Sequence, residues 1–161
     1  MTADPAKVCA RDEQAMSRAI ELAREARAMG EVPVGAVVYR TLTGETLGEG
    51  YNRAETLDDP TAHAEILAIR QAATKIGDWR LNECTLVSTF EPCVMCAGAI
   101  VNARVGRLVY GVINPKAGGV ESLYNIPNYN RLNHRPTILP GLMAEACGEL
   151  LCAFFRSPRG K

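Results

Sequence analysis

Two short segments, thirty residues apart, constrain this chain more than any other feature of its sequence. His63 and Glu65 form the pattern H-x-E, and Pro92, Cys93 and Cys96 form the pattern P-C-x-x-C. Zinc binds imidazole nitrogen and thiolate sulfur, so one histidine and two cysteines can supply three protein ligands. A structural zinc site normally has a fourth protein ligand, whereas a catalytic site leaves that position to water. The sequence therefore predicts one Zn²⁺ per subunit, bound by His63, Cys93 and Cys96.

Glu65 lies two residues after the histidine, and a carboxylate is a harder ligand than this site needs. Zinc lowers the pKa of a bound water to about 7, which makes hydroxide available at neutral pH. We therefore expect Glu65 to be the catalytic residue that takes the proton of the water and returns it to the substrate. The alternative, an incidental histidine and two unrelated core cysteines, is disfavoured because both motifs occur in one chain.

Both motifs are predicted to lie at the start of helices. Asp59 and Pro60 suit an N-cap and a first helical position, and apolar residues at helical spacing follow them. Pro92 is likewise expected to begin a second helix, with Cys93 and Cys96 on one face. The positive ends of the two helices would then meet at the metal and favour thiolate and hydroxide.

The rest of the chain alternates between strand-like and helix-like segments. A helix is expected from an N-cap at Asp12 to Gly30, and another over residues 142–155. Strands are expected over residues 34–39, 46–51, 84–89, 106–112 and 135–139. This alternation indicates an α/β fold, a three-layer sandwich with a central mixed sheet of about five strands and helices on both faces. Residues 1–11 are expected to be loosely held.

Length and composition favour a single cytoplasmic domain over residues 1–161, large enough to bury a core. No long apolar run predicts a membrane span, and residues 1–11 lack the apolar stretch of a signal peptide. The six cysteines do not indicate a disulfide scaffold, because two are assigned to zinc. The other four are expected to be free thiols: Cys9, Cys84, Cys147 and Cys152.

Charge is unevenly distributed along a chain whose formal net charge is zero. Residues 1–102 contain ten Lys and Arg against fifteen Asp and Glu, whereas residues 103–161 contain eight against three. The second part is a candidate surface for binding phosphates. Taken without the motifs, an ordinary solvated surface is the favoured explanation of the same charges.

Four segments, together with the two motifs, resemble the bacterial tRNA-specific adenosine deaminases of the TadA type. They are Asp59–Ile66, Phe90–Ala99, Leu132–Arg135 and Phe154–Arg156. The resemblance extends over about residues 12–159. It implies a cytidine-deaminase-like fold, a homodimer, and conversion of the wobble adenosine in the tRNA anticodon loop to inosine.

The resemblance also implies roles for individual residues. His63, Cys93 and Cys96 would bind zinc, and Glu65 would shuttle protons. The target base would be contacted by Asn52, the backbone amide of Ala64, and the pocket walls Val32 and Phe90. The groove for the nucleic-acid strand would be lined by Asn114, Tyr129, Phe154, Phe155 and Arg156. Stacking of a base on an aromatic ring is worth roughly 1–3 kcal/mol, although helix packing explains either phenylalanine alone equally well.

Several residues depart from the usual enterobacterial pattern. At Asn114 the family often has Asp, which is expected to meet a flanking ribose hydroxyl, so an amide there weakens discrimination of ribose from deoxyribose. The other departures are Arg27, Ala54, Leu57, Phe90, Val112, Asn125, Asn128, Tyr129, Cys152 and Pro158. As a set they resemble substitutions in the laboratory-evolved deaminases of adenine base editors. The chain is therefore interpreted as an engineered variant acting on single-stranded DNA, with fusion to an RNA-guided nuclease as a further expectation.

The expected reaction is hydrolytic deamination, in which hydroxide adds to C6 of a flipped adenine and Glu65 protonates N1 and then the amino leaving group. Two other functions fit part of the sequence. One is a deaminase of a free base or nucleoside, such as guanine or cytosine, built on the same zinc site. The other is a non-catalytic, zinc-stabilised RNA-binding module, in which His134 or Cys84 would be the fourth zinc ligand.

Overall fold

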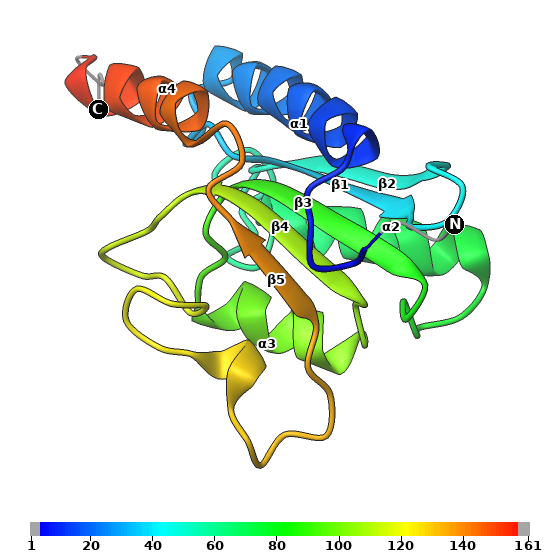
Figure 1. Cartoon of the computed structure of the whole chain (residues 1–161). Coiled ribbons are helices and arrows are strands. Elements are labelled where there is room, and N and C mark those ends of the chain that lie inside the picture. The colour runs from blue at the N-terminus through cyan, green and yellow to red at the C-terminus, as the bar shows by residue number, and fades with distance from the viewer. Residues whose placement is uncertain (1–3, 158–161) are drawn as a thin grey trace.

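A five-stranded mixed sheet forms the middle layer of the computed structural model, which describes residues 4–157 (Figure 1). The strands are β1 (Gly35–Arg40), β2 (Thr46–Tyr51), β3 (Cys84–Phe90), β4 (Arg107–Val112) and β5 (Thr137–Pro140). Their order in the sheet is β2-β1-β3-β4-β5. β1 is antiparallel to β2 and β3, whereas β3, β4 and β5 run parallel to one another.

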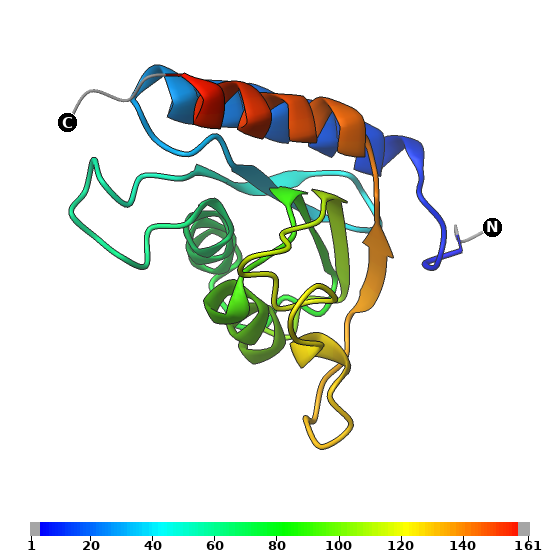
Figure 2. The same ribbon diagram turned by 90° about the vertical axis from the view of Figure 1, so that its left-hand side faces the viewer.

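Helices cover both faces of this sheet. α1 (Ala10–Ala28) and α4 (Ala144–Arg156) lie side by side on one face, and α2 (Ala64–Ile76) and α3 (Val94–Asn102) lie on the other (Figures 1 and 2). A short 3-10 helix, η1 (Ile126–Asn128), interrupts the long connection between β4 and β5. The three layers confirm the predicted fold class. No helix within residues 4–157 is long and apolar enough to span a membrane.

The strands alternate their side chains between two apolar clusters. Val37, Val87 and Val109 contribute to the cluster under α1 and α4. The residues beside them, Val38, Leu86 and Leu108, contribute to the cluster under α2 and α3. Because successive side chains of a strand point to opposite faces and both faces are covered, the central strands are apolar almost throughout.

One edge of the sheet collects the segments that carry both motifs. The parallel strands β3 and β4 end at this edge, and antiparallel β1 begins there, since Ala36 pairs with Ser88 near the end of β3. β2 ends at the same edge, because Tyr51 pairs with Gly35. The connections that follow β2, β3 and β4 therefore converge, and in parallel sheets this edge is the usual place for a ligand site.

Two glycines in β2 let α2 lie unusually close to the sheet. A Cβ atom at Gly48 would lie 2.2 Å from the carbonyl oxygen of Ala68, and one at Gly50 would lie 2.4 Å from that of Ala64. Any side chain at either position would therefore push α2 outward. Because α2 begins at Ala64, these glycines help to set the position of the first motif.

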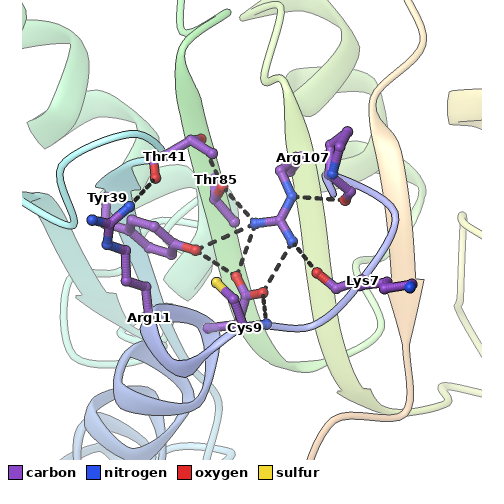
Figure 3. A network of polar contacts seen from close by, with 9 residues as sticks. Lys7, Cys9, Arg11, Tyr39, Thr41, Thr85 and Arg107 are labelled. Atoms are coloured by element: carbon purple, nitrogen blue, oxygen red, sulfur yellow. Dashed lines mark hydrogen bonds and ion pairs between the residues drawn. The ribbon is translucent and has the colours of Figure 1, made fainter. Parts of the chain in front are cut away.

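A buried ionic network lies at the opposite edge of the sheet (Figure 3). The Arg107 guanidinium donates to both carboxylate oxygens of Asp12, at 2.9 and 3.0 Å, and to the Thr85 hydroxyl at 3.1 Å. The Tyr39 hydroxyl also donates to Asp12. All four side chains are buried. The network joins α1 to β1, β3 and β4, and it satisfies both buried charges.

The N-terminal segment is more firmly held than predicted. Arg107 also donates to the carbonyl oxygens of Pro5 and Lys7, at 3.0 and 3.1 Å, which ties residues 4–9 to β4. The Asp12 carboxylate accepts the Cys9 backbone N–H, so Cys9 is the N-cap of α1 and Asp12 is the third helical residue. The predictions of a loose segment over residues 4–11 and of an N-cap at Asp12 are therefore wrong.

The two motif helices also begin later than predicted, with His63 and Cys93 as their N-caps. The Asp59 side chain accepts hydrogen bonds from the backbone N–H and the hydroxyl of Thr61 and forms a local turn instead of starting a helix. Cys93 pairs with Gly118 in an isolated β-bridge, which keeps its backbone extended. His63 and Cys93 therefore precede their helices, whereas Cys96 lies in the first turn of α3.

The last strand and helix are shifted by up to two residues from the predicted ranges 135–139 and 142–155. The cause is a turn between them. The backbone N–H groups of Gly141 and Leu142 both donate to the carbonyl oxygen of Tyr110, and Gly141 and Met143 have positive φ values of 90° and 53°. This turn extends β5 to Pro140 and delays α4 to Ala144.

The Asp12–Arg107 pair generates a stability prediction. Asp12→Ala would leave the Arg107 charge buried without its carboxylate, so we expect the free energy of unfolding to fall by about 3–5 kcal/mol. Urea denaturation monitored by circular dichroism measures this difference. Removing both charges in Asp12→Ala/Arg107→Met should cost less than the single Asp12→Ala change; an equal or larger loss would contradict an ionic role.

The same pair predicts the pH dependence of stability. Burial alone would raise the pKa of Asp12, but hydrogen bonds from Arg107 and Tyr39 outweigh it and hold the pKa below its usual value near 3.8. A pKa that is lower in the folded than in the unfolded chain stabilises the fold fully above about pH 5, and the effect disappears as pH falls through the folded value. The stability difference between the parent and Asp12→Asn should therefore shrink in acid.

Candidate zinc centre and active site

The three predicted zinc ligands meet where α2 and α3 begin. The Nδ1 atom of His63 lies 3.5 Å from the sulfur of Cys93 and 3.5 Å from the sulfur of Cys96. All three ligand atoms lie within 4.8 Å of one another. Cys96 is buried, whereas His63 and Cys93 are half-buried and border a pocket.

These distances fit zinc. A tetrahedral zinc with nitrogen at about 2.05 Å and sulfur at about 2.3 Å holds those atoms about 3.6 Å apart. The observed nitrogen–sulfur distances are both 3.5 Å. One imidazole and two sulfurs are also the donor types that zinc prefers. The group can therefore accept a zinc ion without rearrangement of the backbone.

The site favours a thiolate at Cys93. A hydrogen bond from Cys96 lowers the pKa of Cys93 to about 4, and His63 adds to this effect. The same hydrogen bond and burial raise the pKa of Cys96. Hydrogen bonding to Cys93 raises the pKa of His63, although burial opposes it. Cys93 caps α3, whose N-terminal dipole also favours negative charge.

Neither candidate for a fourth protein ligand joins this group. The Nε2 atom of His134 lies 2.7 Å from the carbonyl oxygen of Val105 and is engaged there. Cys84 begins β3, while the zinc site follows the end of that strand at Phe90. Six strand residues span roughly 20 Å, which places Cys84 far from the site. Among residues 4–157, only His63, Cys93 and Cys96 form a potential metal site.

Glu65 lies in the first turn of α2 and is 4% exposed. The Ser88 hydroxyl lies 2.8 Å from one of its carboxylate oxygens, and the Cys96 sulfur lies 3.4 Å from the other. Burial raises the pKa of Glu65. Ser88 was not predicted as a site residue, because nothing local in a strand sequence shows that its hydroxyl faces a helix from another part of the chain.

His63 and Cys93 border a pocket of about 210 Å³. This volume is smaller than the roughly 300–1,000 Å³ usual for drug-sized ligands and suits one planar base. The pocket is lined by Val32, Val34, Asn52, His63, Ala64, Glu65, Phe90, Glu91, Cys93, Asn114 and Ala117. Among the residues predicted to contact substrate, Val32, Asn52, Ala64, Phe90 and Asn114 thus lie together around the metal site.

The side chain of Asn52 is held in this pocket by its neighbours. Its Nδ2 atom donates to the carbonyl oxygen of Val32 at 3.3 Å, and its Oδ1 atom accepts the N–H of Ala54 at 3.2 Å. The buried carboxylate of Glu31 in turn accepts the N–H groups of Glu55 and Thr56, at 3.1 and 2.9 Å. Glu31, which was not predicted as a site residue, therefore fixes the loop that follows Asn52.

Asn114 begins the connection from β4 that forms the opposite pocket wall. It is 8% exposed, and its Oδ1 atom accepts the N–H of Ala117 at 3.1 Å. Its own N–H donates to the buried carboxylate of Glu91 at 3.0 Å. Burial alone would raise the pKa of Glu91, but hydrogen bonds from this connection outweigh it and hold the pKa below its usual value. Glu91 was also not predicted as a site residue.

The remaining predicted groove residues lie outside this pocket. Tyr129 directly follows η1 and is 54% exposed. Phe155 is also 54% exposed and lines a second hollow on α4 together with Cys152 and Arg156. Phe154 is only 6% exposed and makes an edge-to-face contact with Phe155. Its burial favours the helix-packing alternative for Phe154, while Phe155 is exposed.

The residues interpreted from the sequence as departures from the family pattern lie on several elements of the structure. Phe90 and Asn114 line the pocket, and Val112 ends β4. Ala54 and Leu57 lie in the connection after β2, Arg27 in the last turn of α1, and Asn125, Asn128 and Tyr129 in or beside η1. Cys152 lies on α4, and Pro158 is outside the described residues.

The zinc site generates a binding prediction. Cys96→Ser removes one of three protein ligands, so zinc affinity should fall by more than the roughly 10–100-fold that loss of an outer-shell partner costs. Inductively coupled plasma mass spectrometry after dialysis against a graded chelator measures the retained metal. Cys152→Ser, at an exposed cysteine on α4, is the matched control and should retain zinc. If the two variants retained zinc equally, Cys96 would not be a zinc ligand.

Comparison with known families agrees with the geometry. Residues 9–112 match the family model described as the cytidine and deoxycytidylate deaminase zinc-binding region. The tRNA-specific adenosine deaminase of Bacillus subtilis is 43% identical over 150 residues, which cover 93% of this chain and 92% of the relative. That of Haemophilus influenzae is 43% identical over 157 residues, covering 97% and 90%. The predicted zinc cofactor is thereby confirmed.

Solved structures show the same relationship. A structure from a study of A-to-I editing by tRNA:A34 deaminases has a TM-score of 0.81 and 41% identity, covering 86% of this chain and 99% of its own. A guanine deaminase from Nitrosomonas europaea has a TM-score of 0.74 and 29% identity, covering 92% and 86%. With a zinc site of the deaminase type and relatives aligned over nearly their whole length, the chain belongs to the family of tRNA-specific adenosine deaminases.

Proposed function

We propose that this protein is a zinc-dependent hydrolase acting on cyclic amidines, which deaminates adenine to hypoxanthine within single-stranded nucleic acid. The substrate in the natural family context is the wobble adenosine of a tRNA anticodon loop, which becomes inosine. For this variant, the proposal extends to deoxyadenosine in single-stranded DNA. The observation that carries the proposal is the buried Glu65 carboxylate beside a three-ligand metal group, at a pocket sized for one base.

The reaction needs a nucleophile and a residue that moves protons. Zinc, when held by His63, Cys93 and Cys96, supplies a water whose pKa is lowered to about 7. Glu65 accepts a proton as the water oxygen adds to C6, and passes it to N1 of the base. Glu65 then delivers the second proton of the water to the amino group, which leaves as ammonia. Adenine and water thereby become hypoxanthine and ammonia.

Glu65 is suited to both transfers by its surroundings. Burial favours its protonated form, so Glu65 takes up and holds a proton more readily than an exposed carboxyl group does. The hydrogen bond with Ser88 fixes one carboxylate oxygen and leaves the other on the side of the metal group. A carboxyl group held in this way can receive and return a proton without reorienting its side chain.

The base is held by groups from both pocket walls. Asn52 offers amide groups to the edge of the base, as recognition of a flipped base requires. The N–H of Ala64 belongs to the first turn of α2 and has no acceptor within the helix, so it can donate to the substrate. Val32 and Phe90 supply apolar surfaces for the two faces of the ring.

Activity on DNA is proposed from the residues that surround this pocket. Asn114 carries an amide where the family often has a carboxylate. This pocket wall should therefore discriminate less strongly between ribose and deoxyribose. Among the other departures, Phe90 lines the same pocket and Val112 ends β4 at the same edge of the sheet, which supports the interpretation as a laboratory-evolved variant. Exposed Tyr129, Phe155 and Arg156 offer stacking and phosphate-binding groups outside the pocket.

Deamination of a free base is the second candidate, and the likeness to a guanine deaminase supports it. The pocket would admit a purine with or without an attached strand. Lining residues from four connections and exposed aromatic groups beyond the pocket favour a longer substrate. A homodimer, a cytoplasmic location and fusion to an RNA-guided nuclease remain predictions from the resemblance; size-exclusion chromatography with light scattering tests the first.

The role of Glu65 is tested by substitution. Glu65→Ala should lower kcat by at least about 10²–10⁴-fold, the usual contribution of general acid–base catalysis. The zinc content should stay at the parental level, because Glu65 is outside the ligand group. Single-turnover deamination and metal analysis on the same preparation give both values. A Glu65→Ala enzyme with near-parental turnover would refute the assignment.

The substrate class is tested by direct competition. An adenosine-containing anticodon hairpin, a deoxyadenosine oligonucleotide, free adenosine and guanine are incubated with one preparation, and products are separated by chromatography. We expect both oligonucleotides to be deaminated much faster than either small molecule. Asn114→Asp should lower activity on DNA by about tenfold relative to the hairpin, the effect of about one polar contact.

The possible outcomes separate the candidates. Preferred turnover of guanine or free adenosine would establish the free-base reaction. A clear preference of the parent for the hairpin over DNA would defeat the interpretation as a base-editing variant and leave adenosine deamination in tRNA intact. Asn114→Asp serves as the matched control, because it changes the pocket wall by a single functional group.

A further inference from the structure

Glu91 is a buried carboxylate that takes part in neither zinc binding nor proton transfer. It is 1% exposed, and it lies between the end of β3 and the zinc ligand Cys93. One of its oxygens accepts the N–H of Asn114 at 3.0 Å and the hydroxyl of Ser122. The other accepts the N–H groups of Val120, Glu121 and Ser122, at 3.2, 2.9 and 3.0 Å.

These donors belong to both ends of one segment, residues 114–122, which we call the wall loop. Three consecutive N–H groups converge on one oxygen, an arrangement that binds anions. A carboxylate only accepts hydrogen bonds, and all five donors lie within hydrogen-bond distance of its two oxygens. A buried donor left without an acceptor costs about 1–3 kcal/mol. The wall loop therefore depends on this carboxylate for its shape.

The middle of the wall loop is fitted around the same carboxylate and joined to the zinc-ligand segment. A Cβ atom at Gly118 would lie 2.3 Å from a Glu91 oxygen, so any side chain there would displace it. Gly118 pairs with Cys93 in a β-bridge, and the Gly119 N–H donates to the carbonyl oxygen of Pro92 at 2.8 Å. The metal ligand and the wall loop are thus held in one rigid arrangement.

We propose that Glu91 is a positioning residue for substrate binding, which holds the wall loop so that Asn114 and Ala117 face the zinc site at a fixed distance. Both residues line the pocket; Glu91 also borders it, but its carboxylate accepts hydrogen bonds from the wall loop. Enclosure by N–H groups also compensates its negative charge, which would otherwise oppose a polyanionic substrate. This role rests on the proposed function, since it assigns the wall loop to the nucleic-acid substrate.

Glu91→Gln tests the role with little change in volume. The amide can keep one acceptor oxygen for the N–H groups of Val120, Glu121 and Ser122, but its NH₂ group then faces the N–H of Asn114. Two donors cannot bond to each other, so the start of the wall loop should loosen. We expect KM for the oligonucleotide to rise about tenfold or more, with kcat and zinc content within about threefold of the parent.

A second measurement does not depend on any substrate. Hydrogen exchange followed by mass spectrometry should show faster exchange of the zinc-loaded Glu91→Gln protein in peptides covering residues 114–122, with other regions unchanged. Glu121→Gln is the matched control, because it removes a neighbouring carboxylate whose partner is the Tyr110 hydroxyl. The control should leave KM and the exchange of Asn114 at parental values.

A pair of compensating substitutions distinguishes loss of the Glu91–Gly118 contact from general misfolding. Gly118→Ala should raise KM by crowding the carboxylate, and Glu91→Asp shortens the side chain that is crowded. KM of the double variant Glu91→Asp/Gly118→Ala should lie closer to that of the parent than KM of Gly118→Ala alone. Independent effects would multiply, so a product of the two single changes would overturn the proposed contact.

The outcomes distinguish this inference from the proposed function. Local loosening together with a higher KM supports the positioning role. The positioning role would be overturned if KM stayed unchanged, whether exchange became faster only in the wall loop or throughout the protein. It would also be overturned if hydrogen exchange did not change. If the parent deaminates no oligonucleotide, the proposed function fails, while hydrogen exchange still reports whether Glu91 holds the wall loop.

Discussion

The separation between α2 and α3 is the constraint on which the site depends, because His63 caps one helix and Cys93 caps the other. The nitrogen–sulfur distances of 3.5 Å exist only while both helix ends keep their places. β2 sets the place of α2, since Gly48 and Gly50 have no side chains to hold it away. β3 sets the place of α3 by leading directly into Cys93. The sheet therefore determines the metal geometry, and the metal in turn can link the starts of these two helices.

The two ends of the sheet use buried charge in different ways. At the amino ends of β3 and β4, Asp12 and Arg107 neutralise each other and fasten the N-terminal segment. At the carboxyl ends, Glu65 and Glu91 are buried carboxylates without a salt bridge among residues 4–157. Glu91 is stabilised by backbone N–H groups, whereas Glu65 is left with a raised pKa. At the carboxyl ends of β3 and β4, the two carboxylates thus have pKa values shifted in opposite directions, which suits them to separate roles. Such differences are common in active sites.

The sequence predicted the zinc ligands and the order of most helices and strands, because both depend on short spacings. His63 and Glu65 are two residues apart, and Cys93 and Cys96 are three apart. The contacts that were missed join distant positions. Asp12 and Arg107 are 95 residues apart, Ser88 and Glu65 are 23 apart, and Glu91 meets donors 23–31 residues away. Such pairings follow from strand order and register, which no local pattern encodes. Helix starts were misplaced for the same reason, since Cys93 is kept extended by Gly118 from a later connection.

The C-x-x-C segment has a consequence for the chain before it receives its metal. The hydrogen bond from Cys96 lowers the pKa of Cys93 to about 4, which favours the thiolate form of a sulfur that has a second sulfur beside it. A thiolate next to a thiol is the starting point of disulfide formation and of oxidation to sulfenic acid. Oxidants and zinc therefore compete for the same two sulfurs. Metal loading early in biosynthesis, or a reducing environment until it occurs, preserves the thiols that the finished site requires.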